Sequence, residues 1–170
     1  ISLHPVYAVP GVELCGGRET TPLTIARAAE TLRLAGREPI VIEREVPGLV
    51  ANRLTAALLR EALDLVAQGV IGARDLDRLV ARGIATGWAT RGALGTELAG
   101  SGSATLDEFV AKSEGPMSAL LASLADWRTM APWGREALRR AGQGVREPMG
   151  DCEWAAAIAR VVKAGERGTG

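Results

Sequence analysis

Three polar side chains in the first third of the sequence could together move a proton and hold a hydroxyl group. His4 is the only histidine among the 170 residues, Glu13 lies inside an apolar stretch, and Asn52 stands near the start of an apolar run. A carboxylate that binds an imidazole orients the ring and stabilises its protonated form, so a His–Glu pair is a common general base. These residue types therefore indicate general-base chemistry, with Asn52 as a candidate substrate contact.

Each of these residues also has a purely structural interpretation. A lone histidine is more often structural than catalytic. Glu13 either points to solvent at a sheet edge or has a polar partner, because an unpaired buried carboxylate is costly. Asn52 follows the break Pro47–Gly48, so its amide could bond the backbone at a helix end instead of a substrate. The residues alone leave these alternatives open.

The composition limits the classes of partner and cofactor. The 20 basic and 20 acidic residues cancel, which argues against a polyanion such as nucleic acid. No apolar run reaches about 18 residues and no signal peptide is present, so we expect a cytoplasmic protein without a membrane helix. Cys15 and Cys152 lie far apart without a CxxC motif and are predicted to be reduced thiols. No Cys, His, Asp or Glu cluster has metal-ligand spacing, so no metal is predicted.

The N-terminal part of the sequence predicts a strand, a helix and a second strand. The first strand covers residues 9–15. Thr21 is a natural helix cap, Pro22 suits the first helical position, and Gly36 is the expected stop. The β-branched run 40–42 then forms a strand parallel to the first. Two parallel strands need neighbouring strands and cover on both faces, so they either form the edge of a larger sheet or pair with another chain, and we favour the first.

From residue 46 onward the apolar periodicity is helical. Helices are predicted over 48–68, 73–82, 105–112, 116–128, 133–142 and 152–163. The Gly-rich stretch 83–103 is interpreted as loop with some helix. The sequence GSGSAT, at residues 100–105, is interpreted as a flexible linker and not as a phosphate-binding loop, because it does not match GxGxxG and no strand precedes it. Thr105 and Glu108 form a capping box, whereas Gly115–Pro116 should break the helix. The four tryptophans are expected in the core.

Four segments carry a resemblance to a known family: HPVYAVPGVELCGG, REPIVIEREVPGLVANRL, REALDLVAQGVIGARDLDRLVARG and GWATRGALGTELAG, which together span most of residues 4–100. They resemble the 3-hydroxyacyl-CoA dehydrogenase superfamily, in particular its branch with L-gulonate dehydrogenase (lambda-crystallin) and L-carnitine dehydrogenase. The resemblance implies a mostly α chain. Residues 1–45 would be the truncated edge of an NAD-binding Rossmann domain, a short βαβ remnant. Residues 46–170 would be an all-helical dimerisation domain of the 6-phosphogluconate dehydrogenase C-terminal type.

The resemblance also implies site residues. In the family a His acts as general base on a secondary alcohol, a Glu orients the His, and an Asn contacts substrate. By motif position the Glu is Glu13, in PGVE, and the Asn is Asn52, in ANRL. The family's His stands twelve residues before the Glu, where this chain has Ile1. His4, which takes the Asn position of the pattern HPxNPxYxxPxVE, could be the base only if three residues were lost or the loop were remodelled.

Two functions follow as alternatives. The first is the C-terminal part of an NAD-dependent dehydrogenase that acts on a hydroxy acid or a 3-hydroxyacyl-CoA and forms a homodimer. The NAD fingerprint GxGxxG and its ribose-binding acid are absent from this sequence and would lie upstream, so no cofactor-binding residue is assigned. The second is a non-catalytic helical dimerisation module without a bound cofactor. Arg91 and Ala93 replace an apolar residue and a proline of the family pattern GPGLRWAxMGP, which fits either a changed substrate or a chain released from catalysis.

Overall fold

The structure is a computed structural model that describes residues 9–129, 134–136, 139 and 150–166. The chain forms two compact units. The first comprises the residues up to Leu58 together with 149–160, and the second comprises Leu59 to Pro148 together with the C-terminal end. The predicted division of the chain near residue 46 stays a prediction.

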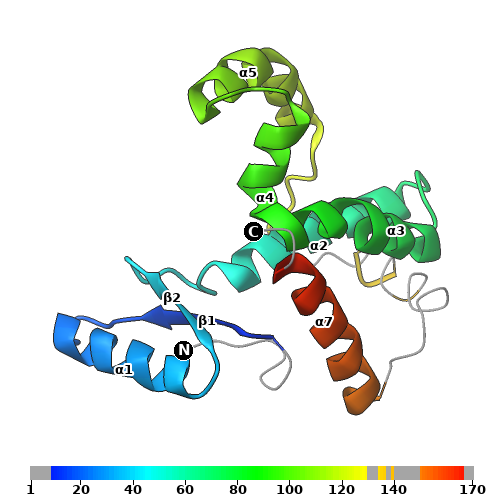
Figure 1. Ribbon diagram of the computed structural model, residues 1–170. Helices are drawn as coiled ribbons and strands as arrows, with labels where there is room; N and C mark the ends of the chain where they lie inside the picture. The colour runs from blue at the N-terminus through cyan, green and yellow to red at the C-terminus, as the bar shows by residue number, and fades with distance from the viewer. Residues whose placement is uncertain (1–8, 130–133, 137–138, 140–149, 167–170) are drawn as a thin grey trace. The chain divides into compact units, whose positions relative to one another are not determined.

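The first unit contains the predicted strand–helix–strand motif. Strand β1 (Gly11–Cys15) pairs in parallel with β2 (Glu38–Ile42), and helix α1 (Pro22–Leu34) connects them and packs against the pair (Figure 1). Strand β2 starts two residues earlier than expected and includes Pro39. A proline is tolerated there because an edge strand has backbone N–H groups that need no ladder partner.

The ends of α1 are set by local side chains, as the sequence predicts. The Thr24 N–H donates to Thr21 Oγ1 at 3.2 Å, and Pro22 occupies the first helical position. Gly36 follows the helix with φ +71°, a left-handed conformation that favours glycine. The Thr cap and the Gly stop therefore fix the crossover between the two strands.

The two strands differ in how well they are covered. In β1, Val12 is fully buried and Leu14 is 3% exposed. In β2, Ile40 and Val41 are 50% and 51% exposed. Neighbouring residues of a strand point to opposite faces, so β2 presents apolar side chains on both of its faces. This uneven cover fits a sheet edge that needs more protein around it.

The remaining elements are helical, and the fold is mostly α as predicted. They are α2 (Ala51–Ala67), α3 (Ala73–Leu79), the π-helical segment η1 (Val80–Ile84), α4 (Ala85–Gly100), α5 (Leu106–Ser123) and α7 (Asp151–Glu166). Within the predicted helix 133–142, residues 134–136 and 139 are helical, and the others lie outside the described residues. Within the described residues, none of the helices combines the length and apolar character needed to cross a bilayer.

Two predictions about helix ends are wrong. The stretch 83–103 is not loop with some helix, because η1 and α4 extend through it to Gly100. A kink at Gly92, with φ +73°, interrupts α4, and the chain turns back so closely that a Cβ at Gly87 would lie 2.7 Å from Thr96 Cγ2. Gly115–Pro116 does not end α5, which continues through Pro116 to Ser123. The glycines thus permit a sharp bend between helical segments rather than a loop.

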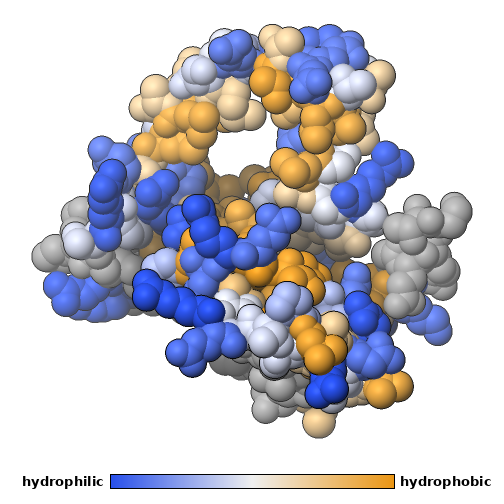
Figure 2. Space-filling model, turned by 90° about the vertical axis from the view of Figure 1, so that its left-hand side faces the viewer, coloured by the Kyte–Doolittle hydropathy of each residue, from blue (hydrophilic) through white to orange (hydrophobic). Residues whose placement is uncertain are grey.

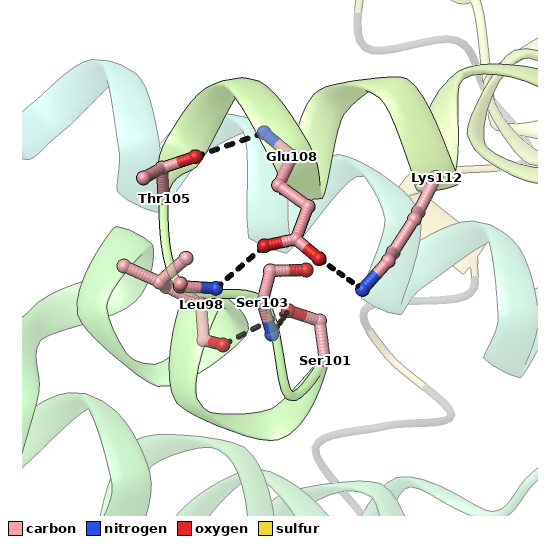
Figure 3. Close-up of polar contacts among 7 residues, drawn as sticks. Leu98, Ser101, Ser103, Thr105, Glu108 and Lys112 are labelled. Carbon is pink, nitrogen blue, oxygen red and sulfur yellow. Dashed lines mark hydrogen bonds and ion pairs between the residues drawn. The ribbon is translucent and has the colours of Figure 1, made fainter.

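The start of α5 confirms Thr105 as the helix cap, whereas Glu108 binds the N–H one residue before the cap instead of that of Thr105 (Figure 3). The Glu108 N–H donates to Thr105 Oγ1 at 3.2 Å, and Glu108 Oε2 accepts the Ala104 N–H at 2.9 Å. Lys112 Nζ lies 2.7 Å from Glu108 Oε1. Both contacts favour the ionised carboxylate, so the Lys112 ammonium first, and the Ala104 N–H second, hold the pKa of Glu108 below its ordinary value.

The described helices bury few large side chains. Leu63 of α2 is 4% exposed, whereas no residue of α5 is buried. The prediction of a tryptophan core is wrong for Trp88 and Trp154, which are 37% and 45% exposed. Large apolar side chains therefore lie open at the surface beside polar ones (Figure 2).

An acidic side chain ties the end of α5 back to α2. Glu61 stands near the apolar stripe of α2, and its Oε2 accepts the N–H of Ala125 at 2.9 Å. Ala125 is 9% exposed and immediately follows the residue that ends α5. One oxygen of this half-buried carboxylate therefore binds a backbone group 64 residues away in the chain.

Candidate active site

Glu13 is buried, with 8% of its surface exposed, and its carboxylate binds backbone rather than solvent. Oε1 accepts the N–H of Val50 at 2.7 Å and the N–H of Ala51 at 3.0 Å. Val50 immediately precedes α2 and Ala51 is its first residue, so neither N–H group has a partner inside the helix. A carboxylate there also complements the partial positive charge of the helix N-terminus. Of the two interpretations open from the sequence, Glu13 therefore has a polar partner.

An unusual turn presents these two N–H groups to Glu13. Gly48 and Leu49 both have left-handed backbone, with φ of +79° and +48°. The Leu49 N–H donates to the Val46 carbonyl at 2.9 Å, which closes the turn. A left-handed conformation costs a residue such as leucine about 1–2 kcal/mol. Such strain persists where surrounding contacts determine the backbone, and the two bonds to Glu13 are contacts of this kind.

Asn52 lies in the first turn of α2 and is exposed. Its side-chain amide makes no hydrogen bond to any other residue in the described part of the chain. The backbone groups that a helix-end asparagine would ordinarily serve are instead bound by Glu13. Asn52 is thus placed one residue beyond the anchored pair Val50–Ala51 with its amide available to a ligand, and its role as a substrate contact stays a prediction.

The second oxygen of the Glu13 carboxylate differs from the first in its hydrogen bonding. Glu13 Oε2 is buried and has no hydrogen-bond partner among the residues that the structure describes. A buried carboxylate oxygen without a donor is costly, and nearly all such oxygens in proteins are paired. Glu13 therefore has one oxygen engaged with α2 and one that still requires a donor such as an imidazole N–H.

His4 and Ile1, the two positions considered for the general base, lie outside the described residues. The structure thus brings Glu13 and the segment of Asn52 together and does not place the third member of the predicted set. The Glu13 bonds to Val50 and Ala51 were missed by the sequence analysis. No local pattern could have shown them, because the partners are 37 and 38 residues apart in the chain.

The turn between β1 and α1 is closed by its own residues. The Gly17 N–H donates to Thr20 Oγ1 at 3.0 Å. A Cβ at Gly16 would meet Thr20 Cβ at 3.2 Å and Ile25 Cδ1 at 3.3 Å, so the chain packs closely at this glycine. Among the described residues, no group of three His, Cys, Asp or Glu side chains is arranged to hold a metal ion.

A surface hollow in the helical part is unrelated to these residues. It is lined by Arg74, Asp77, Arg78, Ala81 and Arg82. None of the predicted site residues is among them, and Arg78 is already paired with Asp75 at 2.9 Å. The chemistry indicated by Glu13 therefore does not come from this hollow.

Comparisons with known proteins agree on one family. Residues 48–127 match the family 3-hydroxyacyl-CoA dehydrogenase, C-terminal domain. An L-carnitine dehydrogenase of Streptomyces coelicolor is 36% identical over 72% of this chain and 40% of its own length. A 5-formyl-3-hydroxy-2-methylpyridine 4-carboxylate 5-dehydrogenase of Mesorhizobium japonicum is 44% identical over 48% of this chain and 26% of its own length. The chain thus spans less than half the length of these curated relatives.

A solved structure supports the same fold. It is a 5-formyl-3-hydroxy-2-methylpyridine 4-carboxylic acid 5-dehydrogenase, an NAD+-dependent dismutase. It is 28% identical to this chain, with a TM-score of 0.73 over 96% of this chain and 54% of its own. The short strand–helix–strand motif and the helices that follow it are therefore shared with a protein about twice as long.

Proposed function

The chain belongs to the 3-hydroxyacyl-CoA dehydrogenase superfamily, in the branch that contains L-carnitine dehydrogenase, and on that premise we propose that it is the C-terminal part of an NAD-dependent dehydrogenase. Residues 1–45 would be the edge of the nucleotide-binding domain and residues 46–170 the helical domain. The fold that binds NAD belongs to the part of such a protein upstream of this chain. The proposed substrate is a small hydroxy acid or a 3-hydroxyacyl-CoA.

The observation that carries this proposal is that the two oxygens of the Glu13 carboxylate have different surroundings. One oxygen fixes the first turn of α2, which bears Asn52, and the other is buried and lacks a donor in the described part of the chain. A purely structural helix cap needs only the first oxygen. The second oxygen supports the proposal because a buried carboxylate oxygen can accept an imidazole N–H and stabilise the protonated ring.

In the proposed reaction, the residues of this chain act on the hydroxyl group of a secondary alcohol. The imidazole of a base, for which His4 is the candidate, accepts the hydroxyl proton. Glu13 Oε2 stabilises the imidazolium that results. The Asn52 amide donates to the alcohol oxygen as it becomes a carbonyl, and so holds the carbon in place. NAD, when bound to the intact protein, would accept the hydride that leaves this carbon. The low exposure of Glu13 strengthens its interaction with the imidazolium, because little water competes for the carboxylate.

The alternative is a non-catalytic helical dimerisation module without a bound cofactor. The exposed apolar side chains of the helices favour association under either proposal. Such a module would have no use for the Oε2 of Glu13, which lacks a donor among the described residues. The two proposals differ in one readout, since only the dehydrogenase changes nicotinamide absorbance in the presence of a hydroxy acid.

The test uses the intact protein, with NAD and a panel that includes L-carnitine, L-gulonate and a 3-hydroxyacyl-CoA. We expect Asn52→Ala to lower kcat/KM at least about 100-fold, the usual cost of removing a donor that stabilises a developing oxyanion. The matched control is Gln68→Ala, which removes an exposed amide just past the other end of α2. Activity of Asn52→Ala within a few-fold of the unmodified protein would remove Asn52 from the site.

We further propose that the protein acts as a homodimer. Four large apolar side chains at helical spacing on α5 form what we term the α5 stripe: Leu106, Val110, Met117 and Leu120. They are 39–58% exposed, and α5 makes no extensive contact with another described helix or strand. An exposed helix gains most of its stability from packing of its apolar face, so the α5 stripe favours a second copy as its partner.

A further inference from the structure

The start of α2 is held at a defined place by the sheet and not by its own sequence. Helix α2 has no Ser, Thr, Asp or Asn immediately before its first residue, Ala51, that could cap it. The segment before it is a turn with two left-handed residues, which the chain does not adopt by preference. The two hydrogen bonds to Glu13 Oε1 supply the missing cap.

We propose that Glu13 is a positioning residue for Asn52, in addition to any role toward a base. The role in catalysis rests on the proposed function, whereas the role in positioning rests on the contacts alone. Asn52 follows directly after the two residues whose N–H groups Glu13 binds. Its Cα is therefore fixed by the same carboxylate that would orient the base.

The strand makes Glu13 a rigid anchor. Val12 and Leu14 on either side of it are buried, and Glu13 lies opposite Ile40 in the parallel register. Buried strand residues move little, because their backbone is hydrogen-bonded and their side chains are packed. The carboxylate thus fixes the first turn of α2 relative to β1 through two charge-assisted hydrogen bonds.

A shared carboxylate couples the two sides of the proposed site. Loss of Glu13 would release α2 and the base together, so the effects of Glu13 and Asn52 substitutions on kcat should not add. Residues that act through one network show such non-additivity, whereas independent residues do not. The conservative variant Glu13→Gln separates the two roles, because its carbonyl oxygen can still accept both N–H groups while the negative charge is gone.

The first test measures hydrogen exchange of the Val50 and Ala51 amides in the intact protein, and it needs no activity. These amides have Glu13 as their acceptor, so we expect Glu13→Ala to accelerate their exchange about 10-fold or more, and Glu13→Gln to restore most of the protection. The amides of α1 report any general loosening of the same unit. The matched control is Glu61→Ala, which removes a carboxylate that binds the Ala125 N–H and should leave Val50 and Ala51 unchanged.

The second test compares kcat and KM of Glu13→Ala, Glu13→Gln, Asn52→Ala and the two double variants. We expect Glu13→Ala with Asn52→Ala to be little slower than Glu13→Ala alone, because Asn52 is already displaced when its anchor is lost. Glu13→Gln should lower kcat while Val50 and Ala51 stay protected, and adding Asn52→Ala to it should lower kcat further, because the anchor is kept. Unchanged exchange in Glu13→Ala would overturn the positioning role, whether or not the protein is a dehydrogenase. Faster exchange in a protein without any turnover would keep the positioning role and reject the proposed function.

Discussion

At the scale of single residues, the turn 47–50 shows how a few backbone angles place a functional group. Gly48 has φ +79°, and a Cβ there would lie 3.5 Å from Asn52 Cβ, an ordinary contact distance. The constraint at Gly48 is therefore conformational and not steric crowding. Leucine at position 49, with φ +48°, already carries part of the cost of this turn.

The first prediction at this scale is that Gly48→Ala lowers the free energy of unfolding by about 1 kcal/mol, because alanine is strained in the left-handed region. Urea unfolding of the intact protein measures the effect. The matched control is Gly100→Ala at the end of α4, where no atom lies within 4 Å of the added Cβ and φ is not positive. That change should be neutral or slightly stabilising. Equal effects of the two substitutions would contradict the role of the turn.

At the scale of elements, features that depend on neighbouring residues were predictable from the sequence, whereas contacts between distant segments were not. The Thr21 cap, the Gly36 stop and the Thr105 cap of α5 are confirmed, because each depends on residues three or four positions apart. The helix through 85–100 was missed, since glycine lowers helix propensity and the pattern hides a kink. The partner of Glu13 was missed because it lies 37 residues away. Candidate residues came from family likeness, and their geometry came only from the fold.

A pH dependence belongs to the scale of a helix end. Lys112 and the Ala104 N–H lower the pKa of Glu108 in the folded protein, so this carboxylate stabilises the fold above its unfolded pKa of about 4.3. The contribution is lost as pH falls through the lower folded pKa. We expect Glu108→Gln to be less stable than the unmodified protein at pH 7, with the difference decreasing as pH falls through the folded pKa and shrinking in high salt. Thermal unfolding over a series of pH values measures it, and a difference that does not decrease in acid would rule out the ionised carboxylate as its source.

At the scale of the whole molecule, the described residues leave much apolar surface uncovered. Ile40 and Val41 of β2 and the α5 stripe are examples, and Trp88 and Trp154 are exposed rather than buried. Tryptophan was predicted in the core because large apolar residues are usually buried. Residue type alone does not determine which of them the fold leaves exposed.

The α5 stripe gives a prediction at this scale. We expect the intact protein to be a dimer at micromolar concentration by light scattering, and Val110→Glu to be a monomer, because a buried unpaired carboxylate is costly. The matched control is Ala111→Glu, an exposed position one residue further around the same helix. It should remain dimeric. A monomeric unmodified protein, or dissociation by both variants, would reject the α5 stripe as the interface.

The hydrogen bond between Glu61 and Ala125 joins residues 64 positions apart. Closing a flexible loop of that length costs about 4 kcal/mol of chain entropy, whereas one hydrogen bond to a charged group returns only about 1.5–3 kcal/mol. This bond alone therefore cannot hold the intervening helices in place. It forms only when other contacts have already closed the loop, so it forms late in folding. The exchange rate of the Ala125 amide therefore reports whether the second unit has completed its folding.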